Sequence, residues 1–482
     1  MPKQITLKLE DLSPLRTVDA RLVSYNIEMT EVTGGTFWKE YTPSQIAGTE
    51  DFPAFTSLED LAGLMQYYPP IDLYDAKLRA LAKALGPVWV RVSGGWANDT
   101  YYDFDGHTGG KAPEGYKRVL TKEQWTGVLD FVKAVDGKLL TSMAVPGGRW
   151  VPEQAKLLFD FSRDYGVSID AVEYINEPNA LGMVVDLGES YPAVFAADHD
   201  DFTRFVHENY PGTLVVGPCA VGDDEIAPSN APTTPTADLM AGMREPLDVF
   251  SYHYYNGSSE RVAFMGGHWP AEEATTEKYL AVAGRTCQYY MPLRDQAAPG
   301  GQMWVTESGD AGGGGDTWAS SYLDVVRTLN ELGSFALLTD GVIFHNTLAS
   351  SDYGFLKHGS FDPRPNYFAV LLWNRLMGTM VYESGIPVQE GAHVYTHSRR
   401  DGKAGIACLV INNSQTQTTT VELPKAAECY TLSADTLRSS VMNLNGKPLV
   451  LGENHDLLEL TPVSVPAGRL ELAPATCTFL VF

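Results

Sequence analysis

Short apolar runs alternate with amphipathic segments through the first three quarters of the chain. The runs are rich in β-branched and aromatic residues, and the segments between them repeat apolar positions at helical spacing, as in LYDAKLRALAKAL at 73–85. Such alternation predicts a parallel sheet, and eight units predict that it closes into a barrel. The eight predicted strands are Arg21–Ile27, Val88–Val92, Lys138–Val145, Ala171–Ile175, Thr213–Val216, Val249–Tyr252, Met303–Val305 and Gly341–Phe344.

The pattern changes after a last helical segment that ends at Gly378. From there apolar or alternating runs follow at short spacing with turn residues between them, which predicts an antiparallel β-sandwich. Gln4–Leu9 has no helix after it and is a candidate strand of the same sandwich. The predicted fold class is therefore α/β, a (β/α)8 TIM barrel (16–378) with a β-sandwich domain (1–15 plus 379–482). The sandwich strands are Val394–Ser398, Gly405–Ile411, Thr418–Leu423, Leu458–Val463 and Cys477–Phe482.

The composition of the chain limits which classes of partner it can bind. The 482 residues carry 35 basic and 60 acidic side chains, a formal charge of −25, which argues against binding nucleic acid or an anionic membrane. Polyanionic substrates are disfavoured unless the barrel mouth is locally basic. No apolar stretch is long enough to span a bilayer and no signal peptide is visible, so a cytoplasmic protein is expected, or a secreted one if a signal has been removed. The oligomeric state is left open.

The cysteine and histidine patterns point to no bound metal and no cofactor. The five cysteines are odd in number and scattered, without a C-x-x-C pair, so reduced buried thiols are expected rather than disulfides or a zinc site. The ten histidines show no ligand spacing.

Two predicted strands run directly into a glutamate. Glu177 follows the fourth strand in the sequence Asn-Glu-Pro-Asn, and Glu307 follows the seventh in Thr-Glu-Ser-Gly. Because the carboxyl ends of barrel strands surround one mouth, both carboxylates are expected to face each other there. A retaining glycosidase needs such a pair, roughly 5 to 5.5 Å apart, with one as acid/base and one as nucleophile. We predict that Glu177 is the acid/base and Glu307 the nucleophile.

A plainer interpretation of Asn-Glu-Pro is a turn that opens a helix, because proline suits the first helical turn and asparagine caps it. The second strand-end glutamate makes the catalytic interpretation the stronger one. Neighbouring residues fit it: Asn176 is placed to bond a sugar 2-hydroxyl, and Tyr255 to donate to Glu307 and keep it ionised. His253 is either a site residue or a satisfied core histidine. The glycine run 312–315 is either an anion-binding nest or a flexible loop.

These residues resemble glycoside hydrolase family 79, the heparanases and β-glucuronidases of clan A. The resemblance implies that backbone N–H groups of Gly313 and Gly314, with Tyr353, hold the carboxylate of a uronic acid. It implies that Glu28 and Asn176 bind sugar hydroxyls. Trp96 and His345 depart from the usual family pattern and are expected as contacts without an assigned bond. The segments that carry the resemblance are 176–179, 253–257, 307–315, 352–356 and 361–367.

The resemblance implies a retaining β-glucuronidase that removes terminal β-linked glucuronic acid by double displacement. An endo-acting, heparanase-like enzyme that cleaves heparan sulfate is also possible, and it needs basic residues along the cleft. The loops supply only scattered Lys39, Arg149 and Arg261. The aromatic loop 33–70 either walls off the cleft beyond one sugar or simply packs over the barrel rim. Two further functions stay open: a glycosidase for neutral sugars, such as a β-xylosidase or β-glucosidase, and a catalytically silent carbohydrate-binding barrel.

Overall fold

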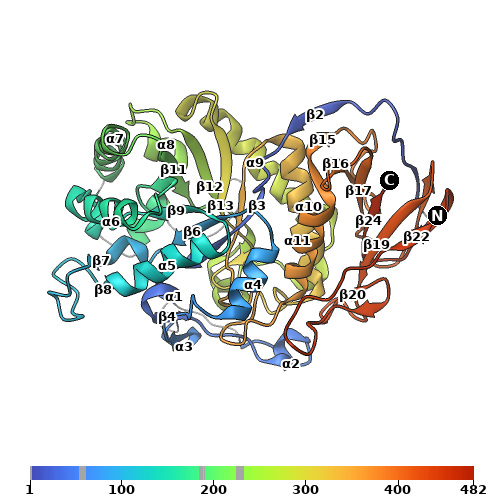
Figure 1. Ribbon diagram of the computed structural model, residues 1–482, viewed down its shortest axis with the longest axis horizontal. Coiled ribbons are helices and arrows are strands. Elements are labelled where there is room, and N and C mark those ends of the chain that lie inside the picture. The colour runs from blue at the N-terminus through green and yellow to red at the C-terminus, as the bar shows by residue number, and fades with distance from the viewer. Residues whose placement is uncertain (1–2, 54–60, 184–187, 189, 224–232) are drawn as a thin grey trace.

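The computed structural model describes residues 3–53, 61–183, 188, 190–223 and 233–482. A barrel ringed by helices lies beside a β-sandwich, and the first and last strands of the chain both belong to the sandwich (Figure 1).

The eight predicted barrel strands are confirmed. Every neighbouring pair is parallel, and the sheet closes in the order β10-β11-β12-β13-β14-β3-β6-β9. The sixth and seventh strands extend several residues beyond their predicted ends and so carry side chains above the rim. The strands are β3 (Val23–Glu28), β6 (Trp89–Ser93), β9 (Lys138–Ser142), β10 (Ala171–Glu173), β11 (Leu214–Ala220), β12 (Val249–Ser258), β13 (Gln302–Gly312) and β14 (Ile343–His345).

Helices cover the outside of the barrel, each with its apolar face inward. In α5, for example, the Thr121 hydroxyl oxygen accepts a hydrogen bond from the Gln124 N–H, and Oε1 of Gln124 accepts one from the Thr121 N–H, so a capping box starts the helix. The longer helices are α4 (Ala76–Ala84), α5 (Lys122–Ala134), α6 (Pro152–Tyr165), α7 (Tyr191–Asn209), α9 (Glu277–Ala297), α10 (Tyr322–Leu338) and α11 (Pro365–Leu376). The short ones are α1 (Met29–Thr33), α2 (Pro43–Ile46), α3 (Leu61–Leu64) and α8 (Thr236–Met240).

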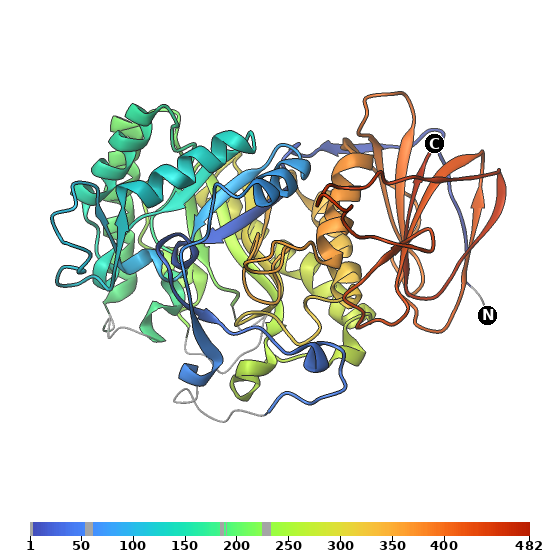
Figure 2. The same cartoon turned by 60° about the horizontal axis from the view of Figure 1, so that its bottom comes forward.

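Two small two-stranded sheets lie beside the barrel. The antiparallel pair β4 (Gly35–Trp38) and β5 (Met65–Tyr68) forms an arm at the mouth, and β7 (Thr100–Asp103) pairs in parallel with β8 (Arg118–Thr121). The turned view in Figure 2 brings this side of the barrel forward.

The barrel interior is layered. An apolar plug fills the lower part, and it includes Trp89 on β6 and Ala171 on β10. Because strand side chains alternate between faces, the residues two positions further on also point inward. These are Arg91 and Glu173, both fully buried. A charged layer therefore lies directly above the apolar plug and below the mouth.

The sandwich consists of an antiparallel sheet of nine strands and a second, mixed sheet of three. In the second sheet β1 pairs in parallel with β18, and β18 pairs antiparallel with β23. The predicted strand 458–463 is placed too early, because β22 begins at Val463. The large sheet contains β2 (Pro14–Thr17), β15 (Met377–Tyr382), β16 (His393–Arg399), β17 (Ile406–Asn412), β19 (Ala427–Ser433), β20 (Asn443–Leu444), β21 (Lys447–Pro448), β22 (Val463–Val465) and β24 (Thr476–Val481). The small sheet contains β1 (Lys3–Thr6), β18 (Thr419–Leu423) and β23 (Gly468–Leu472).

Both faces of the large sheet are buried. The sequence of β17 is therefore a continuous apolar run instead of an alternating one. Leu409 and Ile411 join the core shared with the barrel, whereas Cys408 and Val410 face the small sheet. Helices α10 and α11 lie between barrel and sandwich (Figure 1), and Tyr322 of α10 donates a hydrogen bond to Leu432 O. We propose a domain division near residues 16 and 378, where β2 and β15 begin the large sheet.

All five cysteines are buried free thiols, as the sequence predicts. Within the described residues, no helix combines the length and the apolar character that crossing a membrane requires.

Candidate active site

A cavity of about 850 Å³ opens at the carboxyl ends of the barrel strands. Every candidate site residue from the sequence lines it except Gly314 and His345. The candidates in its wall are Glu28, Trp96, Asn176, Glu177, His253, Tyr255, Glu307, Gly313 and Tyr353.

The two candidate carboxylates face each other across His253. Its Nδ1 lies 2.9 Å from Oε1 of Glu177 and 3.5 Å from Oε2 of Glu307. One oxygen of each carboxylate and the ring nitrogen all lie within 4.8 Å of one another. An oxygen of Glu177 and an oxygen of Glu307 thus lie closer together than the roughly 6.5 to 9.5 Å between the carboxyl groups of an inverting pair, and this spacing fits the roughly 5 to 5.5 Å of a retaining pair. Glu177 is 30% exposed at its side chain and Glu307 only 7%, so the two have different surroundings.

The backbone around Glu177 is held in an unusual conformation. Its φ is 47°, in the left-handed region that non-glycine residues rarely adopt. The Glu177 N–H donates to Cys219 O (3.1 Å), and the side-chain amide of Asn98 exchanges two hydrogen bonds with the backbone of Asn176. These contacts, from the ends of two other strands, hold Glu177 in the mouth despite the strain. The segment after it, Pro178–Met183, is a 3₁₀ turn.

Glu307 reaches the interior through a β-bulge. Tyr252 pairs with Val305, and the next residue of β12, His253, pairs with Glu307, so Thr306 is an extra residue in β13. Without the bulge Glu307 would share the outward face of Val305, which packs in the outer core. The bulge turns the carboxylate into the barrel, as bulges often do beside active sites.

Glu307 is held ionised although it is buried. Burial raises the pKa of a carboxyl group, but the nearby His253 and Arg91, together with a hydrogen bond from the Tyr255 hydroxyl, outweigh burial and leave its pKa below the ordinary value. Nη1 of Arg91 lies 3.0 Å from Oε1, and the Tyr255 hydroxyl donates to Oε2 at 2.8 Å. The expected contact between Tyr255 and Glu307 is thus present.

Arg91 connects the whole site, and sequence reasoning missed it. Its Nε donates to both oxygens of Glu173 at 3.0 Å, and Nη2 donates to Oδ1 of Asn176 at 2.8 Å. Nη2 of Arg91 also lies 3.4 Å from Nε2 of His253. The other ring nitrogen, Nδ1, is therefore the one that bonds the carboxylates of Glu177 and Glu307. A signal was available: Arg91 and Glu173 each interrupt an apolar strand, and a charge inside a buried strand needs a partner.

Glu28 contributes a third carboxyl group to the mouth. Burial, then the neighbouring charges of Glu307 and Glu31, raise its pKa well above the ordinary range. Its Oε2 has no hydrogen-bond partner among the described residues. Gly94 makes room for it, because a Cβ there would lie 1.6 Å from that oxygen, and the φ of Gly94 is +93°. A protonated Glu28 can donate a hydrogen bond to a ligand in the cavity.

Tyr353 lines the cavity, as Glu28 does. Its ring stacks on Tyr255, and its hydroxyl accepts a hydrogen bond from Nδ2 of Asn346 at 3.1 Å. Accepting that bond leaves the phenolic hydrogen available to donate. Asn346 also lines the cavity. It follows the eighth strand, where the sequence analysis named His345 instead.

Two expected ligand contacts lie behind the cavity wall. His345 stacks on Phe355 with ring centroids 3.9 Å apart and bonds Tyr353 O at 2.6 Å, so it supports Tyr353 from the rear. Gly314 is covered by Trp38, which a Cβ at this glycine would approach to 2.6 Å. The position of His345 follows from strand geometry, because side chains along a strand point alternately inward and outward. The sequence could not show whether His345 or Asn346 points into the mouth.

Comparisons with known proteins agree with the family resemblance. The chain matches no family model. It is 28% identical over 363 residues to baicalin-β-D-glucuronidase of Scutellaria baicalensis, a match that covers 72% of this chain and 65% of that protein. With heparanase-like protein 1 of Arabidopsis thaliana it shares 26% identity over 379 residues, covering 70% of this chain and 67% of the relative. The chain is a relative of the β-glucuronidases and heparanases of glycoside hydrolase family 79.

The match with these family 79 relatives spans about two thirds of their length. Among solved structures, a 4-O-α-L-rhamnosyl-β-D-glucuronidase of Fusarium oxysporum superposes with a TM-score of 0.67 over 99% of this chain and 100% of that one. At 12% identity this likeness concerns the fold alone.

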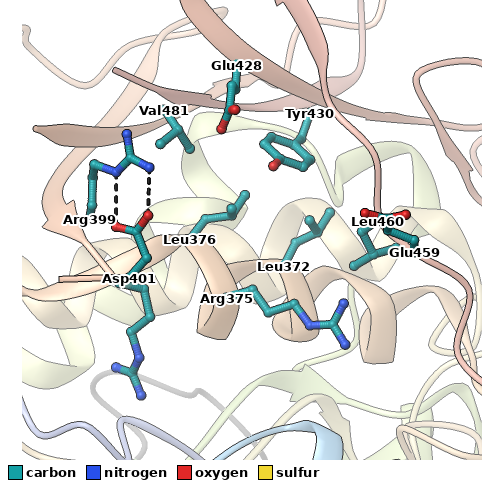
Figure 3. Close-up of a pocket in the computed structure, with 11 residues that line it drawn as sticks. Leu372, Arg375, Leu376, Arg399, Asp401, Glu428, Tyr430, Glu459, Leu460 and Val481 are labelled. Atoms are coloured by element: carbon teal, nitrogen blue, oxygen red, sulfur yellow. Dashed lines mark hydrogen bonds and ion pairs between the residues drawn. The ribbon is translucent and has the colours of Figure 1, made fainter. Parts of the chain in front are cut away.

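A second, smaller cavity of about 290 Å³ lies where α11 meets the sandwich (Figure 3). It is bordered by Leu372 and Leu376 of the helix and by the Arg399–Asp401 ion pair. None of its lining residues belongs to the cavity at the mouth. It therefore has no part in the candidate active site.

Three carboxylate–histidine groups are compact enough to hold an ion among the described residues. One is the set formed by Glu177, His253 and Glu307, whose members already bond one another and Arg91. The others are 103/105/107, on a largely exposed loop, and 260/268/316, beside the glycine run. Glycoside hydrolysis by a pair of carboxylates needs no metal ion.

Proposed function

We propose that the protein is a retaining β-glucuronidase that releases terminal glucuronic acid from β-glucuronides by double displacement. The observation that carries this proposal is the close pair of carboxylates, Glu177 and Glu307, in different surroundings. The family 79 relatives, one of them named as a β-glucuronidase, support the same activity.

Each carboxylate has a distinct role in this mechanism. Ionised Glu307 attacks the anomeric carbon from the α face, while Glu177 gives its proton to the departing glycosidic oxygen. A covalent glucuronyl ester on Glu307 forms and the aglycone leaves. Glu177 then removes a proton from water, which attacks the anomeric carbon and restores Glu307. His253 positions the acid, since its Nδ1 bonds Glu177 at 2.9 Å.

The sugar carboxylate is assigned to the side of the cavity formed by Tyr353 and Gly313. Asn346 donates to the hydroxyls of both Tyr255 (3.0 Å) and Tyr353 (3.1 Å). The Tyr255 hydroxyl donates its hydrogen bond to Glu307. The Tyr353 hydroxyl therefore remains available to donate a hydrogen bond to a ligand. Burial, followed by the neighbouring charges of Glu307 and Glu31, raises the pKa of Glu28 well above its ordinary value, which favours its neutral form in a pocket that must accept an anion.

The Tyr353 assignment is tested by comparing an aryl β-D-glucuronide with the matching β-D-glucoside. The wild type is expected to prefer the glucuronide. Tyr353→Phe is expected to lower kcat/KM for the glucuronide by about 10- to 100-fold, the value of a hydrogen bond to a charged group. Hydrolysis of the glucoside should change by less than about threefold, because that hydrogen bond is absent.

Tyr165→Phe is the matched control, because that hydroxyl bonds Asp130 away from the cavity. Equal losses on both sugars in Tyr353→Phe would refute the carboxylate assignment and favour a glycosidase for neutral sugars. Absence of turnover of either sugar by the wild type would contradict the proposed activity.

Tyr255→Phe is expected to shift the pH profile. The tyrosine hydroxyl lowers the pKa of Glu307, so its removal raises that pKa. A nucleophile with a higher pKa becomes protonated at higher pH, and the acidic limb of the kcat/KM profile should therefore move to higher pH. The measurement is kcat/KM across the acidic range for wild type, Tyr255→Phe and Tyr165→Phe. An unmoved acidic limb would show that Tyr255 does not tune Glu307.

Terminal action is favoured over cleavage within a sulfated chain. The arm residues Phe37 and Trp38 form part of the cavity wall. The arm is fastened by Arg261, which stacks on Tyr41 at 3.8 Å, pairs with Asp352 and bonds Lys39 O. Two of the scattered cations noted in the sequence are thus engaged: Arg261 is buried, and Arg149 pairs with Asp198 outside the cavity.

A further inference from the structure

The cavity is larger than one sugar requires. Its volume of about 850 Å³ lies in the range that holds a drug-sized ligand. If glucuronic acid occupies the part around Glu307 and Tyr353, the remaining volume receives the leaving group. The chemistry of that remaining wall therefore selects the aglycone. This inference rests on the function proposed above.

The acid marks where the leaving group emerges. Glu177 follows β10, and the next strands around the barrel are β11 and β12. The wall on this side is made by Ala180 and Met183, just after the acid, and by Val221 and Gly222, just after β11. The side-chain amide of Asn179 bonds both N–H and C=O of Val221, so the two segments form one surface.

This surface is apolar and open. Met183 exposes 39% of its surface although it is a large hydrophobic residue. No charged side chain other than Glu177 belongs to the wall segments 177–183 and 221–222 that the structure describes. An exposed apolar surface inside a binding cavity is a place for an apolar ligand group.

The cavity continues past β12 toward α9, and acidic side chains outnumber Lys and Arg among its described lining residues. Trp269 and Val282 continue the apolar wall, with Lys278 and Arg285 of α9 at the border. Nζ of Lys278 lies 4.6 Å from the Trp269 ring centre and 4.0 Å from a Glu273 oxygen. Among the described lining residues, these two cations face the four carboxyl groups of Glu28, Glu177, Glu273 and Glu307. A polysulfated chain requires the opposite balance.

We propose that the leaving-group site takes an apolar, ring-bearing alcohol or phenol and excludes sulfated sugars. The ring lies against Met183 and Val221, next to the acid, and extends toward Trp269. Glucuronides of aromatic or alicyclic alcohols are accordingly the substrate class, and heparan fragments are poor substrates.

The test compares 2-phenylethyl with methyl β-D-glucuronide, two alkyl glycosides whose leaving alcohols differ little in acidity, so that binding of the ring is isolated from leaving-group chemistry. The phenylethyl compound is expected to have a kcat/KM at least about tenfold higher, since even one methylene in an apolar pocket can contribute that factor. Met183→Ser and Val221→Ser should each reduce this ratio by about threefold or more. Val388→Ser, at a 52% exposed position outside the cavity wall, should leave the ratio unchanged.

The outcomes separate the two proposals. Hydrolysis of both glucuronides with a ratio near one, or with a ratio that the two wall variants leave unchanged, would overturn the apolar leaving-group site. Faster cleavage of a heparan sulfate octasaccharide than of the phenylethyl compound would overturn it as well. If no glucuronide or heparan fragment is hydrolysed at all, the proposed function itself fails.

Discussion

Replacing Glu307 by glycine is expected to lower kcat for an aryl β-D-glucuronide by about 10⁴-fold or more, because the variant lacks the group that forms the covalent intermediate. Azide should restore turnover by entering the vacated space and attacking the anomeric carbon from the α face. The product should then be the α-glucuronyl azide. The measurement is kcat with and without azide, together with the anomeric configuration of the product.

Glu177→Gly provides the paired control for this prediction. Azide should rescue it too, but by attacking the glucuronyl ester on Glu307 from the opposite face, which gives the β-azide. Interchanged azide anomers would reverse the two roles. Sugar binding without turnover by the wild type, unchanged in Glu307→Gln, would identify a carbohydrate-binding barrel instead of an enzyme.

Arg91→Met is expected to reduce both stability and activity. The guanidinium pairs with buried Glu173 at 2.9 Å and with Glu307 at 3.0 Å. Removing one partner of a buried ion pair leaves an uncompensated charge and costs about 3 to 5 kcal/mol. Loss of Arg91 also raises the pKa of Glu307, so less of the nucleophile is ionised. The urea midpoint should fall, together with kcat at neutral pH.

A double substitution separates the two effects of Arg91. Arg91→Met with Glu173→Gln should recover part of the lost stability, because Glu173 no longer carries a buried charge, while activity stays low. Arg163→Met is the matched control, since Arg163 and its partner Asp164 are both exposed, at 55% and 71%, and such pairs contribute at most about 1 kcal/mol. An Arg91→Met protein with wild-type unfolding and kcat would contradict the role assigned to this arginine.

The sequence predicted the barrel well because its strands are short apolar runs between amphipathic helices. It also predicted both candidate carboxylates, since polar residues at the ends of parallel strands meet at one mouth. What it could not show was the direction of individual side chains. Strict alternation would turn Glu307 outward, and only the bulge at Thr306 turns it inward. The same limitation led to His345 being named where Asn346 lines the cavity.

Other parts of the site depend on contacts between distant segments. Asn98, from the second strand's loop, fixes the backbone of Asn176, and Trp38, from the arm, covers Gly314. Neither contact has a local pattern in the sequence. Arg91 is different, because an arginine inside an apolar strand signals a buried partner, and Glu173 is the matching charge two strands away.

The most direct test of the account is the anomeric form of glucuronic acid released first, followed by proton NMR immediately after the enzyme is added to an aryl β-D-glucuronide. Oxygens of Glu177 and Glu307 that lie within 4.8 Å of each other predict net retention, so the β anomer should appear first and the α anomer only later, through spontaneous mutarotation. Initial release of the α anomer would show inversion and would contradict the assignment of Glu307 as a nucleophile.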